Sequence, residues 1–128
     1  MFRERPPDYE AVALDESGLS VRDVVVPDEG PEVAEGDTVA IHYDLWLPDK
    51  TLVESSRTTG SPLRIKVGSG AVPRGLEKGL IGMRLYGRRR VEVPSALGFG
   101  AEGRPPSIPP DSDLVFEVEV MEHDRAGK

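Results

Sequence analysis

Residues 37–47 constrain the fold more than any other part of the sequence, because apolar side chains recur there at every second position. These positions are Val39, Ile41, Tyr43, Leu45 and Leu47. Successive side chains of a β-strand point to opposite faces, so the pattern predicts a strand with one apolar face. A strand of this kind is typical of an antiparallel sheet that is covered on one side and open to solvent on the other.

Four further segments are predicted to be strands: residues 20–26, 63–67, 90–93 and 114–121. The last alternates most clearly, with Leu114, Phe116 and Val118 on one face and Glu117 and Glu119 on the other. Each segment is short and is followed by residues that favour turns. Together the segments predict an antiparallel sheet of about five to six strands.

One segment has the period of a helix. Between residues 75 and 84, Leu76, Leu80 and Met83 recur at i, i+4 and i+7, which places them on one helical face. A short helix cannot bury such a stripe alone, so the sheet is expected to wrap around it. The sequence therefore predicts an α+β fold in which an antiparallel sheet surrounds one short α-helix.

The length of 128 residues fits one compact domain. Residues 1–17 are rich in charge and proline and are interpreted as a polar N-terminal extension. The domain is expected to span residues 18–124, with 125–128 as a C-terminal tail. Two long loops, residues 98–110 and 55–61, interrupt the strands, and loops of this kind are often functional.

Charge and composition exclude several function classes. The chain has 23 acidic and 16 basic residues, a formal net charge of −7, which disfavours nucleic acid and anionic membranes as partners. There is no cysteine, hence no disulfide or Cys-ligated metal, and no apolar run approaches a membrane span. We expect a cytoplasmic monomer, although export of a longer precursor stays open. The run at residues 88–90 is interpreted as a solvated surface, and His42 and His123, the latter placed in the tail, receive no role.

Five short motifs follow one another between residues 18 and 123: GDTVAIHY at 36–43, ESSR at 54–57, VPRGLEKG at 72–79, LGFG at 97–100 with IPP at 108–110, and LVFEVE at 114–119. Their order and spacing resemble those of the FKBP-type peptidyl-prolyl cis/trans isomerases. That family has an antiparallel sheet wrapped on a short helix, so the resemblance implies the FKBP-like fold that the periodicity also predicts.

The resemblance implies catalysis of rotation about Xaa-Pro bonds, whose uncatalysed barrier is about 20 kcal/mol. No bond is made or broken, so no cofactor or metal is expected. An apolar pocket favours the twisted amide, which is less polar than the planar one. The implied partners are proline-containing peptides or unfolded protein clients, and macrolide-type ligands with weakened affinity.

The resemblance also implies site residues. At the reacting amide it places Tyr43, Glu54 and Phe99. For substrate binding it implies Val53, Leu63, Val72, Pro73, Leu76, Ile108 and Phe116, with Leu76 as the pocket floor. From the residues alone, core packing is the better explanation of Val72, Leu76, Ile108 and Phe116, and Glu54 would ordinarily be a surface charge; only the family resemblance places them in a pocket.

Four positions depart from the family pattern. Leu76 replaces a usual tryptophan and Val53 a usual phenylalanine, while Phe99 lacks the hydroxyl of a common tyrosine. Pro73 has no N–H where a backbone donor normally meets a substrate carbonyl. Two lost donors weaken binding by roughly 5- to 150-fold, so we expect reduced isomerase activity. The alternative is a non-catalytic FKBP-like module that binds peptides or acts as a chaperone.

Overall fold

A computed structural model describes residues 2–4, 12–13 and 18–126 of the chain. Within these residues it contains eight strands: β1 (Phe2–Glu4), β2 (Val12–Ala13), β3 (Ser20–Pro27), β4 (Thr38–Trp46), β5 (Leu52–Ser55), β6 (Leu63–Lys66), β7 (Arg88–Val93) and β8 (Leu114–Asp124). Two α-helices and one 3-10 helix accompany them: α1 (Ser56–Thr59), α2 (Arg74–Leu80) and η1 (Ser95–Leu97).

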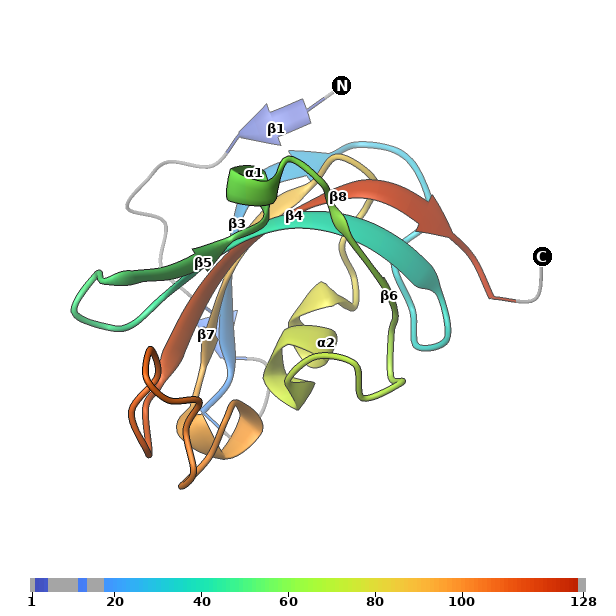
Figure 1. Ribbon diagram of the computed structural model, residues 1–128. Coiled ribbons are helices and arrows are strands. Elements are labelled where there is room, and N and C mark those ends of the chain that lie inside the picture. The colour runs from blue at the N-terminus through green and yellow to red at the C-terminus, as the bar shows by residue number, and fades with distance from the viewer. Residues whose placement is uncertain (1, 5–11, 14–17, 127–128) are drawn as a thin grey trace.

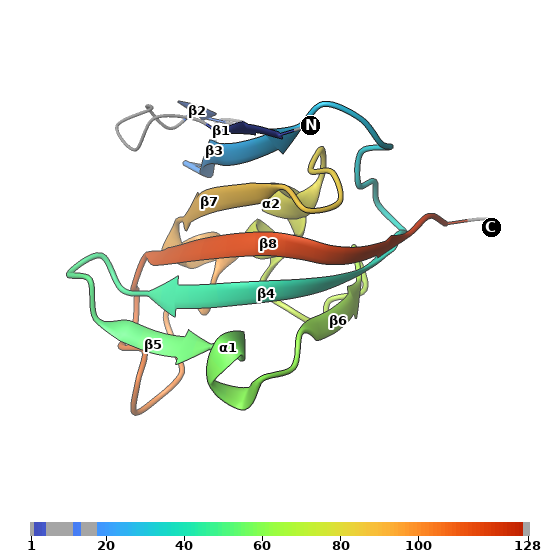
Figure 2. The same ribbon diagram turned by 90° about the horizontal axis from the view of Figure 1, so that it is seen from above.

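All the described strands belong to one antiparallel sheet, in the order β1-β3-β7-β8-β4-β5, with β2 pairing with β3 and β6 pairing with β4. The sheet curves around α2, which lies on its concave side (Figure 1). Seen from above, the strands run side by side over the helix (Figure 2). Six strands fall after residue 18, so the predicted fold class is confirmed. The domain boundaries stay a prediction.

The central strand β4 follows the predicted alternation except at Ala40, which is also buried, and it ends at Trp46, one residue before Leu47. It pairs with β8 from Thr38 and Asp124 at one end to Trp46 and Val115 at the other. Its inward-facing residues Val39 and Ile41 are completely buried. The apolar face of the sheet and the helix therefore share one hydrophobic core, as the period of two requires.

Helix α2 is shorter than predicted. It ends at Leu80, because Ile81 adopts an extended conformation and Gly82 a positive φ of 93°. Met83 was expected on the helical stripe, but it is buried from the turn that follows the helix. The periodicity of residues 75–84 thus identified the buried side chains correctly and the end of the helix incorrectly.

Two glycines let α2 approach the sheet closely. A Cβ atom on Gly75 would lie 2.4 Å from Cγ1 of Val93, and one on Gly79 would lie 2.6 Å from Cγ1 of Val91. Real Cβ atoms do not approach other carbons this closely, so the separation between α2 and β7 requires glycine at both positions. The position of Leu76, between the two glycines, is fixed by the same contact.

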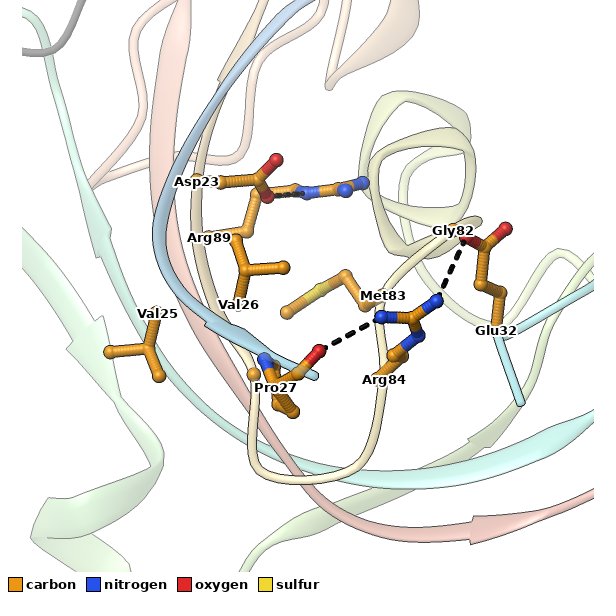
Figure 3. A pocket seen from close by; sticks show the side chains of 10 residues that line it. Asp23, Val25, Val26, Pro27, Glu32, Gly82, Met83, Arg84 and Arg89 are labelled. Atoms are coloured by element: carbon orange, nitrogen blue, oxygen red, sulfur yellow. Dashed lines mark hydrogen bonds and ion pairs between the residues drawn. The ribbon is translucent and has the colours of Figure 1, made fainter. Parts of the chain in front are cut away.

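The interpretation of residues 88–90 as a solvated run is wrong for Arg89. Strand β7 begins at Arg88, and its alternation turns the Arg89 side chain inward. Nε of Arg89 lies 2.7 Å from Oδ1 of Asp23 (Figure 3). Nη1 of Arg89 donates to the carbonyls of Gly79 at 2.9 Å and Ile81 at 3.0 Å. A cation in this position satisfies carbonyls that the end of α2 leaves without partners.

His123 does not lie in a tail. Strand β8 continues to Asp124, and the largely buried His123 side chain places Nε2 2.7 Å from Oδ2 of Asp37. Asp37 also accepts hydrogen bonds from the backbone N–H groups of Ala126 at 2.8 Å and Ala34 at 2.9 Å. The hydrogen bond from Ala126, followed by those from His123 and Ala34, lowers the pKa of Asp37 to about 2. This carboxylate ties the end of β8 to the start of β4.

Candidate functional site

A pocket of about 330 Å³ opens between α2, the concave face of the sheet and the loop of residues 98–110. We call it the Leu76 pocket. Its apolar lining comes from β4, β6, β8, α2 and two loops: Tyr43, Leu45, Leu63, Ile65, Ala71, Val72, Pro73, Leu76, Phe99 and Phe116. Three charged residues, Glu54, Arg64 and Arg104, complete it. The pocket is concave and mostly apolar with few polar groups, as ligand-binding sites usually are.

The floor and walls of the Leu76 pocket are continuous with the hydrophobic core. Leu76 is 1% exposed and Phe116 is 3% exposed. Tyr43 and Phe99 are partly buried against the same core. The rings of Tyr43 and Phe116 have centroids 6.3 Å apart and are tilted by 53°. Such tilted aromatic pairs are favourable and rigid, so the wall is preformed.

Eight of the ten residues that the sequence predicted for the site line the Leu76 pocket: Tyr43, Glu54, Leu63, Val72, Pro73, Leu76, Phe99 and Phe116. Val53 and Ile108 do not line it. Val53 packs against the core from β5. Ile108 is 1% exposed and exchanges two backbone hydrogen bonds with Arg104, at 2.8 and 2.9 Å. For Ile108 the geometry therefore corresponds to core packing, which also anchors the loop.

Glu54 is not an isolated surface charge, because both of its carboxylate oxygens are engaged. The hydroxyl of Tyr43 donates a hydrogen bond to Oε2, and Nη2 of Arg104 lies 2.8 Å from Oε1. Burial, together with the hydrogen bond to Glu54, raises the pKa of Tyr43 to about 12. The Tyr43 hydroxyl is therefore protonated at neutral pH, and it donates its hydrogen bond to Glu54.

Sequence reasoning missed Arg104. Its guanidinium carbon lies 4.8 Å from the centroid of the Phe99 ring, in addition to the ion pair with Glu54. The length of the 98–110 loop was a signal for function, but loop residues have no periodicity that gives the direction of a side chain. The clasp formed by Arg104 and Glu54 connects this loop to β5 across the mouth of the Leu76 pocket.

Two further polar residues hold the backbone of segments that contribute to the pocket lining. The buried carboxylate of Glu77 accepts hydrogen bonds from the N–H groups of Gly68 at 2.8 Å and Gly70 at 3.1 Å. It thereby fixes the loop that leads into Val72. The hydroxyl of Ser56 accepts from the backbone N–H of Tyr43 at 2.8 Å. No sequence motif signalled either role.

Donors to a bound ligand are scarce in the Leu76 pocket. Pro73 precedes α2 and has no N–H, which suits the start of a helix, where such groups lack partners. Phe99 has no hydroxyl. The guanidinium of Arg64 faces Glu122 and Asp124. Among the described lining residues, the two arginines carry exposed polar hydrogens, and Arg104 faces one carboxylate where Arg64 faces two.

Other hollows of the described structure are less suited to a ligand. The one in Figure 3, between β3 and the turn after α2, has a volume of about 60 Å³, enough for only a few water molecules. It is lined by ion-paired side chains that include Arg84 and Arg89. A wider surface hollow of about 590 Å³ follows residues 27–31 with Leu85 and Tyr86. Its lining has two acidic residues and one aromatic residue but no basic one, whereas acidic, basic and aromatic side chains meet around Glu54 in the Leu76 pocket.

The described part of the chain contains no cluster of three or more His, Asp or Glu residues close enough to hold a metal ion. Among its helices none is long and apolar enough to cross a membrane.

Comparison with known proteins gives a consistent result. The sequence pattern of one family, described as FKBP-type peptidyl-prolyl cis-trans isomerase, matches residues 30–121. An FK506-binding protein of Neisseria meningitidis serogroup C is 40% identical over 92 residues, which cover 72% of this chain and 84% of that protein. The peptidyl-prolyl cis-trans isomerase FKBP15-2 of Arabidopsis thaliana is 39% identical over 87 residues, which cover 68% of this chain and 53% of that protein.

The fold is similar as well. The crystal structure of AtFKBP13 superposes with a TM-score of 0.81 at 31% sequence identity, covering 88% of this chain and 98% of the other. The matched segment, residues 30–121, includes all thirteen residues that line the Leu76 pocket.

Proposed function

The chain belongs to the FKBP-type peptidyl-prolyl cis-trans isomerase family, and from that premise we propose that it catalyses rotation of Xaa-Pro peptide bonds in peptides or unfolded protein chains. The observation that carries the proposal is the Leu76 pocket, a preformed apolar site with one buried aliphatic floor and three aromatic walls. A prolyl ring is a compact apolar group that such a site can bury.

The pocket supports catalysis by favouring the twisted amide. Twisting the C–N bond removes its conjugation and makes the amide less polar. A prolyl ring that lies over Leu76, between Tyr43 and Phe116, would place the Xaa-Pro amide against apolar surface with little water. Since only interactions that strengthen in the twisted state lower the barrier, an apolar wall contributes to turnover as well as to binding.

Tyr43 and Phe99 are proposed to act at the amide itself, and Glu54 is proposed to act through Tyr43. Aromatic ring edges carry partial positive charge, so Tyr43 and Phe99 offer weak C–H contacts to a rotating carbonyl oxygen. Glu54 keeps the Tyr43 hydroxyl in one orientation. Glu54 is therefore a positioning residue in this scheme, and its two engaged oxygens leave it little capacity to bind the substrate directly.

The isomerase activity is proposed to be weaker than that of a site with a backbone N–H at position 73 and a hydroxyl at position 99. Pro73 and Phe99 remove two hydrogen bonds to a bound peptide or macrolide-type ligand, each contributing about 0.5–1.5 kcal/mol. Hydrogen bonds made equally in the planar and twisted states affect affinity more than turnover. Pro73 is also the observation that favours the second candidate, a module that binds proline-containing segments without accelerating their rotation.

Exchange NMR on a set of Xaa-Pro peptides separates the two candidates. An isomerase should increase the cis/trans exchange rate, and Phe99→Ala should reduce the increase. Ile81→Ala is a matched control, because Ile81 is apolar, exposed and outside the Leu76 pocket. Peptide binding without faster exchange would favour the binding module, and the absence of both would contradict both candidates.

A further inference from the structure

The mouth of the Leu76 pocket carries one arginine that is partly exposed and only partly paired. We propose that Arg104 is a specificity-determining residue, which favours Xaa-Pro segments with a carboxylate side chain next to the proline. The inference rests on the proposed function, because it concerns which Xaa-Pro segments the same pocket accepts.

The backbone of Arg104 is held rigidly, so its side chain starts from a fixed point. Its N–H and C=O pair with Ile108, and the preceding N–H of Gly103 donates to the carbonyl of Phe99 at 3.1 Å. Gly103 has a φ of 66°, and a Cβ there would lie 2.5 Å from the carbonyl oxygen of Ile108. The turn that presents Arg104 therefore depends on glycine and has little freedom.

The guanidinium group is positioned a second time by its own contacts. It stacks over Phe99, with Cζ 4.8 Å from the ring centroid, and donates through Nη2 to Glu54. A guanidinium that is already oriented loses less conformational freedom when it binds another acceptor. Arg104 is thus prepared to meet a ligand at the pocket mouth.

Part of the guanidinium remains available. In the part of the chain that the structure describes, Nε and Nη1 of Arg104 make no hydrogen bond, and the side chain is 42% exposed. Carboxylates match the planar donor edge of arginine better than neutral acceptors do. An acidic substrate side chain that reaches the mouth would therefore find a free charged donor.

A basic substrate side chain would find no unengaged carboxylate oxygen of Glu54 at the mouth. Both oxygens of Glu54 are engaged, one by Tyr43 and the other by Arg104. A substrate lysine would have to compete with Arg104 for that carboxylate. The other arginine of the lining, Arg64, faces Glu122 and Asp124 across the edge of the sheet. The charged group that remains available at the mouth is therefore the cationic guanidinium of Arg104, although the whole chain has a formal net charge of −7.

Two peptides of identical composition separate this contact from the long-range field. One has Glu directly before the proline and Gln five positions away, and the other exchanges the two residues. The wild type should give a kcat/KM that is about two- to fivefold higher for the first peptide, the size of a partly exposed ion pair. The ratio should fall to about one in Arg104→Gln and recover in part in Arg104→Lys.

Arg64→Gln is the matched control, since it removes an arginine from the same lining that is already paired, and it should leave the ratio unchanged. Raising the salt concentration should lower the wild-type ratio, because exposed charges are screened. A wild-type ratio of one or less, or a ratio that survives in Arg104→Gln, would overturn the proposal. Should neither peptide be accelerated, the proposed function fails separately, and the ratio of the two peptide dissociation constants then decides the role of Arg104 by the same criterion.

Discussion

Replacing Gly79 with alanine should destabilise the protein, although alanine is the better helix former. Alanine in a helix interior is favoured over glycine by about 0.8–1.0 kcal/mol. In this fold the new Cβ would lie 2.6 and 2.8 Å from the two Cγ atoms of Val91, which is completely buried in β7. Overpacking of this kind costs about 1–3 kcal/mol. The net expectation is a loss of about 1 kcal/mol, and up to about 2 kcal/mol, in the free energy of unfolding.

Urea unfolding, followed by circular dichroism, measures this loss as a lower midpoint at constant slope. The double variant Gly79→Ala with Val91→Ala tests the cause, because removing the Cγ atoms removes the two closest contacts and leaves only Cβ of Val91 at 3.3 Å. Relative to Val91→Ala alone, the added alanine should then cost less or become stabilising. If Gly79→Ala is more stable than the wild type, α2 does not pack on β7 as closely as described. The position of Leu76 at the floor of the pocket, which depends on that packing, would then be wrong as well.

Three other predictions follow from individual contacts. Phe99→Tyr restores a hydroxyl at the pocket wall and should tighten peptide binding by about two- to twelvefold, measured by NMR titration; unchanged affinity would count against a lost donor there. Asp37 has a pKa lowered from 3.8 to about 2, so its contribution to stability is present above about pH 4 and is lost as the pH falls toward 2. Asp37→Asn should be less stable at neutral pH and lack this loss in acid unfolding curves, and an unchanged acid limb would refute the assignment. Arg89→Met leaves Asp23 and two helix-end carbonyls without their donor and should cost about 2–3 kcal/mol, as expected for polar groups left unsatisfied, whereas a neutral effect in urea unfolding would show that the ion pair is dispensable.

The sequence predicted the fold well where a single period describes a segment. Residues 37–47 and 114–121 alternate strictly enough to identify β4 and β8 and their buried faces. Periodicity was less informative at the ends of elements. The end of α2 depends on the backbone conformation of Ile81 and Gly82, and a hydrophobic stripe continues past that point because Met83 is buried from a turn.

The polar part of the site was harder to predict, because it depends on contacts between residues that are distant in the sequence. Glu54 was placed at the site by resemblance, but its partner Arg104 is fifty residues away in a loop. Arg89 looked like part of a surface run until its position in β7 turned it toward the end of α2. Ile108 was predicted for the pocket, and the structure places it in the core below the loop. A sequence pattern predicts which face of a strand or helix a residue occupies, whereas its contact partners can be identified only from the assembled fold.

The central claim is that the Leu76 pocket binds the prolyl ring, and amide chemical shifts test it most directly. Isotope-labelled protein would be titrated with a short Xaa-Pro peptide, with the same peptide carrying alanine for proline as a control. We expect the largest shift changes in α2, β5 and the loop of residues 98–110, and only with the proline peptide. Changes confined to residues 27–31 and the neighbouring Leu85 and Tyr86, or equal changes with both peptides, would contradict the account.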